Sequence, residues 1–259
     1  MTGGTMFSEI QINLEEPTLL YEQEEHAVYW LGITDDTAFR CNAYLIVDGD
    51  EAIIVDPGSR SHFEQVKNRV AQIMTPESIT GMILCHQDPD VAASMVDWLV
   101  LNPKATVFTS PRTVVLLPHY GKKDFIAYDI EENPRYEMPS GRALSFITAP
   151  FLHSPAAFVT FDENARHLFS GDIWAALTTE WELITYDFEQ HALNMDLFHI
   201  DYMASNVAAN GFVNKIAHLE IDAILPQHGS IIARNNVPAA LDYLRTLRCG
   251  TDIAYPELG

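Results

Sequence analysis

Basic residues are scarce in this 259-residue sequence, which has 15 lysines and arginines against 36 aspartates and glutamates. The net charge of −21 disfavours nucleic acid as a partner, because phosphate recognition requires clustered Lys and Arg side chains. Anionic membrane surfaces are disfavoured for the same reason. We therefore expect no nucleic acid and no membrane as partners, and a protein partner would need a basic patch.

Cysteine and long apolar runs are also rare. The three cysteines, Cys41, Cys85 and Cys249, form an odd and widely spaced set, which is typical of free thiols in a reducing cytoplasm. No run approaches the roughly 18 apolar residues of a membrane helix, and the N-terminus lacks a secretory signal. The sequence predicts a cytoplasmic protein. Met6 is an alternative start, which would make residues 1–5 a cloning remnant or a disordered leader.

Low-complexity tracts, internal repeats and linkers rich in Gly, Pro or Ser are absent, so we expect one domain over residues 1–259. Strand patterns occur at 43–47, 52–55, 79–84, 105–109, 143–148, 157–161, 167–169 and 223–225. Helical patterns occur at 62–74, 91–101, after Ser110-Pro111, and at 194–219 and 237–247. Two successive β-rich halves with helices predict an α/β fold in which two mixed sheets pack face to face between helical layers.

The most informative stretch is residues 84–91, where an apolar strand leads directly into His86, Asp88 and Asp90. Side chains at alternating positions between a strand end and a helix start can converge on one point above the sheet. Such a polar cluster is costly for folding unless something binds to it, which makes a metal site the first hypothesis. Cys85 is interpreted as a buried thiol at the strand end, with a ligand role as the alternative.

Further candidate ligands occur downstream at His153, Asp172 and His228. Each falls just after a predicted strand, where the loops at one edge of the sandwich would meet. Taken alone, each has an ordinary structural interpretation, such as a loop histidine or a helix-capping aspartate. The ordered set with residues 86–90 is much more specific for metal binding than any single member.

Several motifs, in this order, resemble the metallo-β-lactamase fold from about residue 28 to residue 235. They are Asn42-Ala-Tyr-Leu-Ile, Ile54-Val-Asp-Pro-Gly, His86-x-Asp-x-Asp, His153, Ser170-Gly-Asp and Pro226-Gln-His-Gly. The resemblance implies a metallo-β-lactamase αββα sandwich with the metal ligands in loops at one edge.

Within this fold, the hydrolases carry His-x-His-x-Asp-His and bind zinc. This sequence has Asp88 at the position of the second His and Val91 at that of the last. An acidic residue at the second position is the mark of the flavodiiron branch, whose non-haem di-iron centre reduces oxygen or nitric oxide. Independently of the resemblance, replacing imidazole by carboxylate makes the donor set harder and favours iron or manganese over zinc.

The resemblance also implies which residues hold two iron ions. His86, Asp88 and His153 would bind one iron, Asp90 and His228 the other, and Asp172 would bridge them. Three carboxylates would neutralise most of the charge of two divalent ions and leave positions open for a small molecule. Val91 falls where some relatives have a further ligand, so the coordination number of the second iron is open. Asp88 is one methylene shorter than the Glu usual in the reductases.

Four further residues are candidates for the wall of an oxygen pocket. Tyr202 and His199 lie where flavodiiron relatives have aromatic residues lining that pocket, with helix packing as the alternative. Trp174 and Trp181 follow Asp172 closely and are interpreted as core residues, with a place in the pocket wall as the alternative.

The sequence after His228 contains one more predicted helix and a short tail, without a Gly/Ser/Thr-rich phosphate-binding loop. We therefore expect no FMN in this chain, although flavodiiron reductases usually carry a flavodoxin domain. The runs Gln-Asp-Pro-Asp-Val, Met-Ala-Ser-Asn and Pro-Gln-His-Gly-Ser resemble flavin-domain-lacking members of the family, proposed as oxygen-binding sensors linked to signalling proteins.

Three functions therefore stand as hypotheses. The favoured one is a non-haem di-iron protein that binds dioxygen as a sensor or carrier and reports to a signalling protein of the chemotaxis or histidine-kinase type. The second is an oxygen or nitric oxide reductase fed by a separate flavoprotein. The third is a dinuclear zinc hydrolase, in which a metal-bound hydroxide attacks an ester or phosphate. The sequence leaves open whether the chain forms a homodimer.

Overall fold

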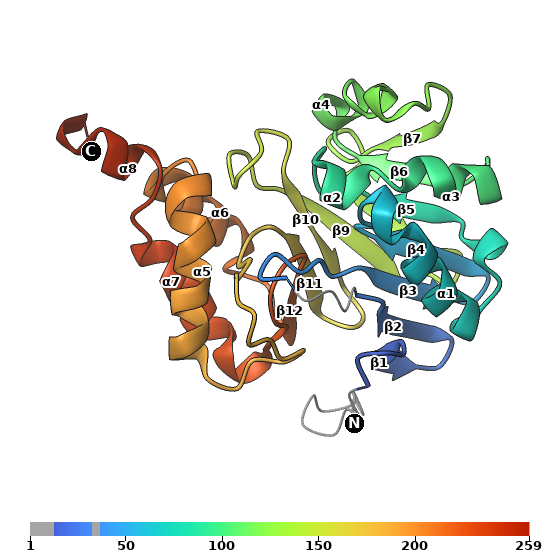
Figure 1. The fold of residues 1–259 in the computed structure, drawn as a ribbon, viewed down its shortest axis with the longest axis horizontal. Coiled ribbons are helices and arrows are strands. Elements are labelled where there is room, and N and C mark those ends of the chain that lie inside the picture. Colours follow the sequence, from blue (N-terminus) through green and yellow to red (C-terminus); the bar gives the residue numbers. More distant parts are fainter. Residues whose placement is uncertain (1–12, 33–36, 259) are drawn as a thin grey trace.

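The computed structural model describes residues 13–32 and 37–258, so the predicted leader at residues 1–5 lies outside the described residues. A seven-stranded sheet packs face to face against a six-stranded sheet (Figure 1). The first sheet follows the chain order: β1 (Thr18–Gln23), β2 (His26–Trp30), β3 (Tyr44–Asp48), β4 (Glu51–Val55), β5 (Gly81–Ile83), β6 (Thr106–Thr109) and β7 (Ile126–Asp129). The second has the order β13 (Ile232–Ala233), β12 (Ala223–Pro226), β11 (His167–Gly171), β10 (Phe158–Asp162), β9 (Ala143–Thr148) and β8 (Arg135–Glu137).

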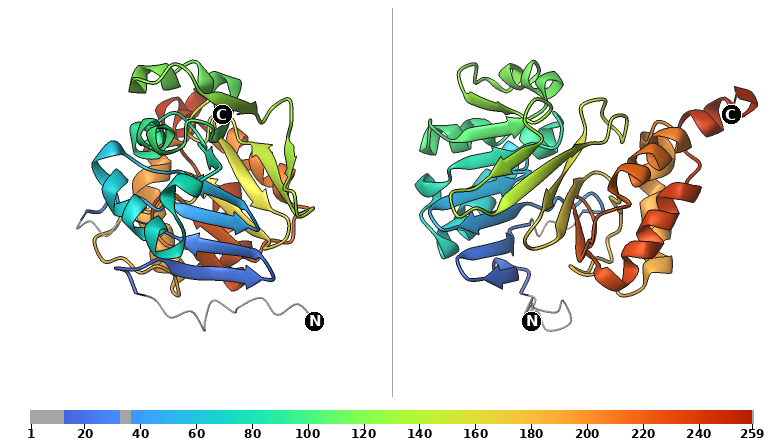
Figure 2. Two further views of the ribbon diagram at one scale, coloured as in Figure 1. Left: turned by 90° about the vertical axis from the view of Figure 1, so that its right-hand side faces the viewer. Right: turned by 180° about the vertical axis from the view of Figure 1, so that it is seen from behind.

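Helices cover the outer face of each sheet (Figures 1 and 2). On the first sheet these are α1 (Phe63–Ile73), α2 (Pro89–Ala92) and α3 (Met95–Leu101), with the short α4 (Pro111–Val114) near β7. On the second they are α5 (Phe188–Tyr202), α6 (Asn206–Ile216) and α7 (Val237–Thr246). The C-terminal α8 (Thr251–Ala254) projects from this second helical layer. Within the described residues, no helix is both long and apolar enough to cross a bilayer.

Three apolar clusters fill the spaces between these four layers. The cluster between the two sheets includes Trp30 and Phe158. A second cluster joins the first sheet to its helices through residues such as Trp98. A third joins the second sheet to α5, α6 and α7, as at Phe198 and Phe212. Because the central strands of each sheet are covered on both faces, strands such as β10, β11 and β12 are buried along their whole length. The predicted αββα sandwich is confirmed.

The predicted strands and helices all occur, with end shifts and two breaks. Residues 91–101 form the end of α2 and all of α3, and residues 194–219 lie in α5 and α6. The second break is explained by Ser205, whose hydroxyl accepts a hydrogen bond from the Ala208 N–H at 3.3 Å and begins a new helix. Five strands were not predicted from the sequence, namely β1, β2, β7, β8 and β13. Strands β7 and β8 are short and half exposed, so they carry little apolar signal.

Topology brings the candidate ligands to one edge of the sandwich. Strand β5 lies parallel to β4 and β6, and β11 lies parallel to β12. The carboxyl ends of parallel neighbours share a sheet edge, and side chains that follow them come close together. His86 follows β5, Asp172 follows β11 and His228 follows β12.

Three histidines outside this edge cluster are buried in their neutral form. Burial lowers the pKa values of His167, His191 and His199 to about 4 in each case. Unfolded histidines take up a proton near pH 6.5. The unfolded state therefore binds more protons than the folded state between pH 6.5 and 4. The stability that these residues contribute above pH 6.5 is lost as the pH falls through this window.

We expect His191→Gln to weaken this pH dependence in the metal-free protein. Removing one such histidine should reduce the slope of the unfolding free energy against pH, between pH 6.5 and 4, by about 1.4 kcal/mol per pH unit. Urea denaturation at a series of pH values measures this slope. The matched control is His218→Gln, because His218 is exposed. Equal slopes in the two variants would contradict the assignment of a neutral buried His191.

Candidate metal centre

Six imidazole and carboxylate side chains meet at the edge where β5, β11 and β12 end. Three come from the segment after β5, one from the loop between β9 and β10, and two from the segments after β11 and β12. They are His86, Asp88, Asp90, His153, Asp172 and His228. All six predicted ligands are therefore brought together by the fold.

Asp172 lies at the centre of this cluster, and its side chain is only 5% exposed. Its Oδ2 is 2.8 Å from His153 Nε2 and 3.2 Å from His86 Nε2. Its Oδ1 is 3.5 Å from His228 Nε2. One oxygen of this carboxylate thus faces two imidazoles and the other faces a third, which is the arrangement that a bridging ligand requires.

On one side of Asp172, the ligand atoms of His86, Asp88 and His153 all lie within 4.8 Å of one another. Asp88 Oδ2 is 3.6 Å from His86 Nε2 and 3.4 Å from His153 Nε2. Atoms bound to one ion at about 2.1 Å are separated from each other by roughly 3 to 4 Å. The three side chains are therefore spaced to hold one ion.

On the other side, Asp90 Oδ2 is 3.1 Å from His228 Nε2. Cys41 joins these two residues, and the three ligand atoms again lie within 4.8 Å of one another. Val91, which follows Asp90, is fully buried in the apolar layer beneath α2. From its sequence context, Cys41 was predicted only to be a free thiol, and its place beside Asp90 and His228 was not anticipated.

Unsatisfied polar atoms test whether this cluster fits cations. His86 Nε2, His228 Nε2 and Asp172 Oδ1 are buried and have no hydrogen-bond partner among the described residues, despite their short separations. Leaving a buried polar atom unpaired costs about 1–3 kcal/mol. Two cations would satisfy all three atoms at once. Three imidazoles and three carboxylates are donors that suit iron, so the residues fit a di-iron pair.

In His228 and His86, the contact made by Nδ1 determines that Nε2 faces the cluster. His228 Nδ1 donates a hydrogen bond to the Arg40 carbonyl at 3.1 Å, which leaves the lone pair of Nε2 inside the cluster. His86 Nδ1 lies 3.0 Å from Cys85 Sγ, on the opposite side of the ring from Asp172. Cys85 therefore supports His86 from behind.

Without cations, the carboxylates shift the proton affinities of the imidazoles. Burial alone would lower the pKa of His153, but hydrogen bonds and charge from Asp172 and Asp88 outweigh it and raise the pKa to about 9. Burial would likewise lower the pKa of His86, but Asp172 outweighs it and raises that pKa. Burial opposes protonation of His228 as well, and there Asp90, Cys41 and Asp172 raise the pKa. In the metal-free protein, protonated imidazoles therefore balance the negative charge of the carboxylates. Cations that replace these protons must release them to solvent.

Two glutamines orient two of the acidic candidate ligands. Gln87 donates from Nε2 to Asp88 Oδ1 at 2.9 Å and accepts from the Ser154 hydroxyl at 2.9 Å. Gln227 donates from Nε2 to the Asp90 carbonyl at 3.1 Å. Such hydrogen bonds restrict the rotation of a carboxylate or its backbone and so preserve the ligand positions.

Asn42 holds the segment that carries His228. Its side-chain amide donates to the carbonyls of Pro226 at 2.9 Å and Gly229 at 2.8 Å, and its Oδ1 accepts from the Trp30 indole at 2.8 Å. Asn42 belongs to a motif that the sequence analysis quoted without assigning a role to this residue. A buried amide at the start of an apolar strand was the available signal.

Tyr202 lies beside His153. Its ring stacks on Phe198 with 4.5 Å between ring centroids, and it meets the His153 ring edge-on at 5.8 Å. Tyr202 is 56% exposed, so these rings lie between His153 and solvent. On the other side of the cluster, the Phe39 ring lies 4.0 Å from that of His228. Phe39 was not anticipated from the sequence.

His199 supports the cluster from outside it. Its Nε2 accepts a hydrogen bond from the Trp174 backbone N–H at 2.9 Å, and its Nδ1 donates to the Met195 carbonyl at 3.0 Å. Both ring nitrogens are therefore engaged. Because Trp174 lies two residues after Asp172 and has a φ of +65°, His199 fixes the turn that follows this ligand.

The two tryptophans pack away from the ligands. The Trp174 indole is fully buried and donates to the Ala240 carbonyl in α7 at 2.8 Å. Trp181 stacks on Trp30 with 5.7 Å between ring centroids, and the Arg40 guanidinium lies over its ring at 4.7 Å. Both contacts match the core interpretation more closely than the pocket-wall alternative.

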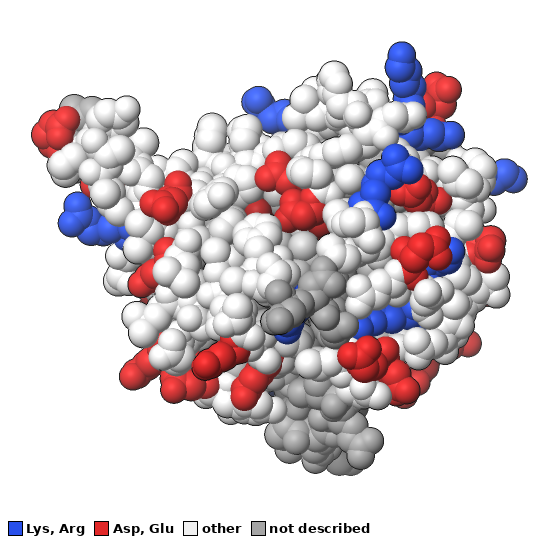
Figure 3. Space-filling view, in the orientation of Figure 1, with Lys and Arg blue, Asp and Glu red and all other residues white. Residues whose placement is uncertain are grey.

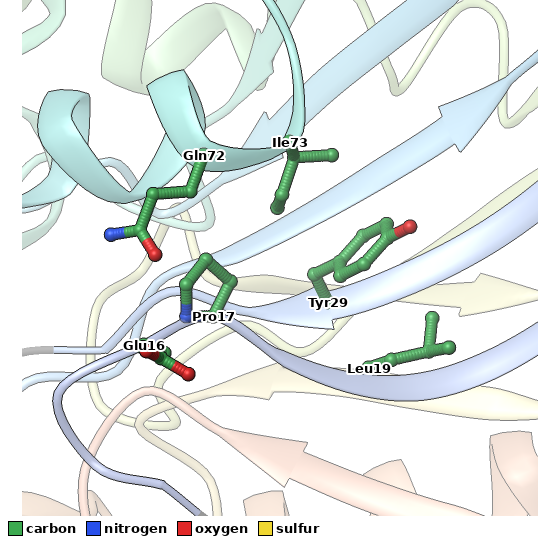
Figure 4. A pocket seen from close by; sticks show the side chains of 6 residues that line it. All are labelled: Glu16, Pro17, Leu19, Tyr29, Gln72 and Ile73. Atoms are coloured by element: carbon green, nitrogen blue, oxygen red, sulfur yellow. The ribbon is translucent and has the colours of Figure 1, made fainter.

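Charge is unevenly distributed over the surface, and one surface hollow lies outside the cluster. Acidic side chains are spread over the face seen in Figure 3, whereas basic ones gather over the first sheet. A hollow of about 380 Å³ lies between β1, β2 and the end of α1 (Figure 4). Its lining includes one carboxylate and no histidine or cysteine, so this hollow is not the metal centre. Its residues are Glu16, Pro17, Leu19, Tyr29, Gln72 and Ile73.

Solved structures resemble this fold over almost the whole chain. The chemotaxis sensor ODP from T. denticola, in its apo state, is 34% identical, with a TM-score of 0.81 over 94% of this chain and 98% of that one. A structure described as a peroxy diiron species of chemotaxis sensor ODP is 32% identical, with a TM-score of 0.82 over 94% and 99%. A flavo di-iron protein variant from Thermotoga maritima, 21% identical over 89% and 61%, has a TM-score of 0.75 and shares the fold.

Curated relatives are longer than the matched region. The diflavin flavoprotein A 1 of Synechocystis sp. is 29% identical over 144 residues, which are 55% of this chain and 24% of that protein. The chain spans about a third or less of the first curated relatives that it matches. The family model described as ODP family beta lactamase matches residues 39–229, well over half of the chain. The chain therefore belongs to the ODP family of β-lactamase-like proteins.

Proposed function

We propose that this chain holds two iron ions at the six clustered side chains and binds dioxygen there, as a sensor or carrier. The observation that carries the proposal is Asp172, whose two oxygens face two separate sets of ligand atoms. Support also comes from a 32% identical neighbour described as a peroxy diiron species of a chemotaxis sensor. When bound, the iron ions would supply the redox and Lewis-acid chemistry that dioxygen binding needs.

The protein residues would set the conditions for this chemistry. Asp172 would hold the two ions close together, and His86, His153 and His228 would bind them as neutral donors after losing their protons. The aromatic rings of Phe198 and Tyr202 cover His153 and would limit the access of water. When little water reaches the site, bound dioxygen is retained and is less readily reduced further and released.

A sensor or carrier is preferred to a reductase because of the relatives that match over nearly their full length. The neighbours that are 32% and 34% identical are described as a chemotaxis sensor, and this chain covers 99% and 98% of them. We accordingly propose a signalling protein of the chemotaxis or histidine-kinase type as the partner. A cytoplasmic location is supported by the three cysteines, which are all buried and unpaired.

Anaerobic loading with ferrous iron followed by exposure to air separates sensor from reductase. A sensor or carrier should take up about one dioxygen for each pair of irons and keep a long-lived visible absorbance. Repeated oxygen consumption with a reduced flavoprotein as donor would instead support the reductase alternative. Two zinc ions with esterase activity would contradict the iron centre and support the hydrolase.

Asp88→His should shift the metal preference of the site toward zinc. The change restores the imidazole that zinc hydrolases of this fold carry and makes the donor set softer. With iron and zinc offered together under anaerobic conditions, we expect the bound zinc-to-iron ratio to rise on the order of tenfold. Elemental analysis measures this ratio. Asp242→His, at an exposed position, is the control, and an unchanged ratio in Asp88→His would count against this role of the carboxylate.

A further inference from the structure

The half of the cluster around His228 contains a thiol. Cys41 Sγ, an Asp90 carboxylate oxygen and a His228 ring nitrogen lie within 4.8 Å of one another, and Cys41 is only 8% exposed. Backbone pairing brings the thiol there. Cys41 and His228 form an isolated antiparallel bridge, and the Asn42 N–H donates to the Gln227 carbonyl at 2.6 Å. Directly opposed residues of such a pair place their side chains next to each other.

A second observation indicates that Cys41, Asp90 and His228 surround a position for a cation. His228 is fully buried, and its Nε2 has no hydrogen-bond partner in the described part of the chain. Because His228 Nδ1 donates to the Arg40 carbonyl, the lone pair of Nε2 points toward Asp90 and Asp172. An unpaired buried nitrogen is stable in this position only if a cation or proton occupies the space between these groups.

The number of ligands differs between the two halves. One half has four protein donors, which are His86, Asp88, His153 and the Oδ2 atom of Asp172. Without a thiol, the described residues give the other half only Asp90, His228 and the other oxygen of Asp172. The buried apolar side chain of Val91 supplies no donor.

We propose that Cys41 is a thiolate ligand of the cation held by Asp90 and His228. The inference rests on the proposed function only in requiring a cation at that position. On binding, the thiol loses its proton to solvent and a sulfur–metal bond forms, without a change of oxidation state. The two positions then differ chemically. One offers nitrogen and oxygen donors, and the other offers nitrogen, oxygen and sulfur, which suits softer ions.

Cys85 provides an internal contrast. Its sulfur lies 3.0 Å from His86 Nδ1, behind the ring, whereas His86 Nε2 faces Asp172. Cys85 is thus a thiol next to the cluster that is not positioned as a ligand, and Cys41 is the one that is.

Titration of the metal-free protein with cobalt(II) tests the proposal, because thiolate-to-cobalt charge transfer absorbs strongly in the near ultraviolet. We expect this band in the wild type and in Cys249→Ala, which removes a buried thiol beside α8. We expect its loss in Cys41→Ser, which keeps a donor of similar size. Cys41→Ser should also release about one proton fewer per chain at saturation.

The outcomes separate this inference from the proposed function. If the wild type binds two cobalt ions without the charge-transfer band, Cys41 is not a ligand while the metal centre stands. If no cobalt binds, both proposals fail. A band that persists in Cys41→Ser would also overturn the inference. X-ray absorption of the cobalt-loaded wild type needs no variant, and it should show a cobalt–sulfur distance of about 2.3 Å.

Discussion

Asp172→Asn is expected to weaken the binding of both iron ions strongly. The carboxylate lies within 2.8 to 3.5 Å of three imidazole nitrogens, and its two oxygens serve both halves of the cluster. An amide cannot bridge two cations through two anionic oxygens. We expect the affinity for ferrous iron to fall by more than about a hundredfold, beyond the usual effect of losing an outer partner. Anaerobic titration with ferrous iron measures this change.

The control for this variant is Asp242→Asn. Asp242 is exposed on α7, where it pairs with Arg245 at 2.8 Å. The same chemical change there should leave iron binding unaltered, since surface ion pairs contribute at most about 1 kcal/mol to stability. Retention of two tightly bound irons by Asp172→Asn would contradict the central position given to this carboxylate.

Gly229→Ala is expected to destabilise the fold and weaken iron binding together. Gly229 follows His228 directly and has a φ of +85°. A Cβ atom there would lie 2.7 Å from the Ala176 Cβ and 2.9 Å from the Ala176 backbone nitrogen. The backbone must therefore move, and His228 moves with it. We expect a loss of about 2–5 kcal/mol in the free energy of unfolding, from the left-handed conformation and the overpacking combined.

Gly141 offers a closely matched control. Its φ is +89°, but a Cβ added there would meet nothing within 4 Å. Gly141→Ala should therefore incur only the cost of the left-handed conformation, about 1–2 kcal/mol, and leave iron affinity unchanged. Chemical denaturation and iron titration of both variants separate the two contributions. Equal losses at Gly229 and Gly141 would show that the contact with Ala176 does not restrict the backbone.

Much of the fold was predictable because its strands are short apolar runs with clear boundaries. The hairpin of β3 and β4 shows this, since Asp48-Gly49-Asp50 separates two runs and Gly49 has a φ of +59°. The edge strands were missed for a physical reason. In β7 and β8, most side chains are partly or fully exposed, so selection for apolar residues is weak there.

The six clustered side chains were predicted from their order in the sequence and from a family resemblance. The fold brings them together, and their binding of iron stays a prediction. The place of Cys41 could not be predicted, because it depends on backbone pairing between two segments of different sheets. Cys41 precedes β3 in the first sheet, and His228 follows β12 in the second. The same holds for Asn42, whose hydrogen bonds reach Pro226 and Gly229. Contacts between residues so far apart leave no local pattern in a single sequence.

His199 illustrates a different limit. Its position in the sequence suggested either the oxygen pocket or helix packing. In the structure both ring nitrogens are engaged, one with the Trp174 N–H and one with the Met195 carbonyl. Residue type and spacing could not reveal this, because the hydrogen bond depends on the backbone conformation after Asp172. The histidine acts on the ligand through the turn and not through a metal bond.

The most direct measurement is anomalous X-ray scattering at the iron edge from crystals grown anaerobically with ferrous iron. We expect two iron peaks in each chain. One should lie among His86, Asp88 and His153, the other between Asp90 and His228, with Asp172 in contact with both. A single peak, peaks remote from these side chains, or no bound iron after reconstitution would contradict the di-iron centre.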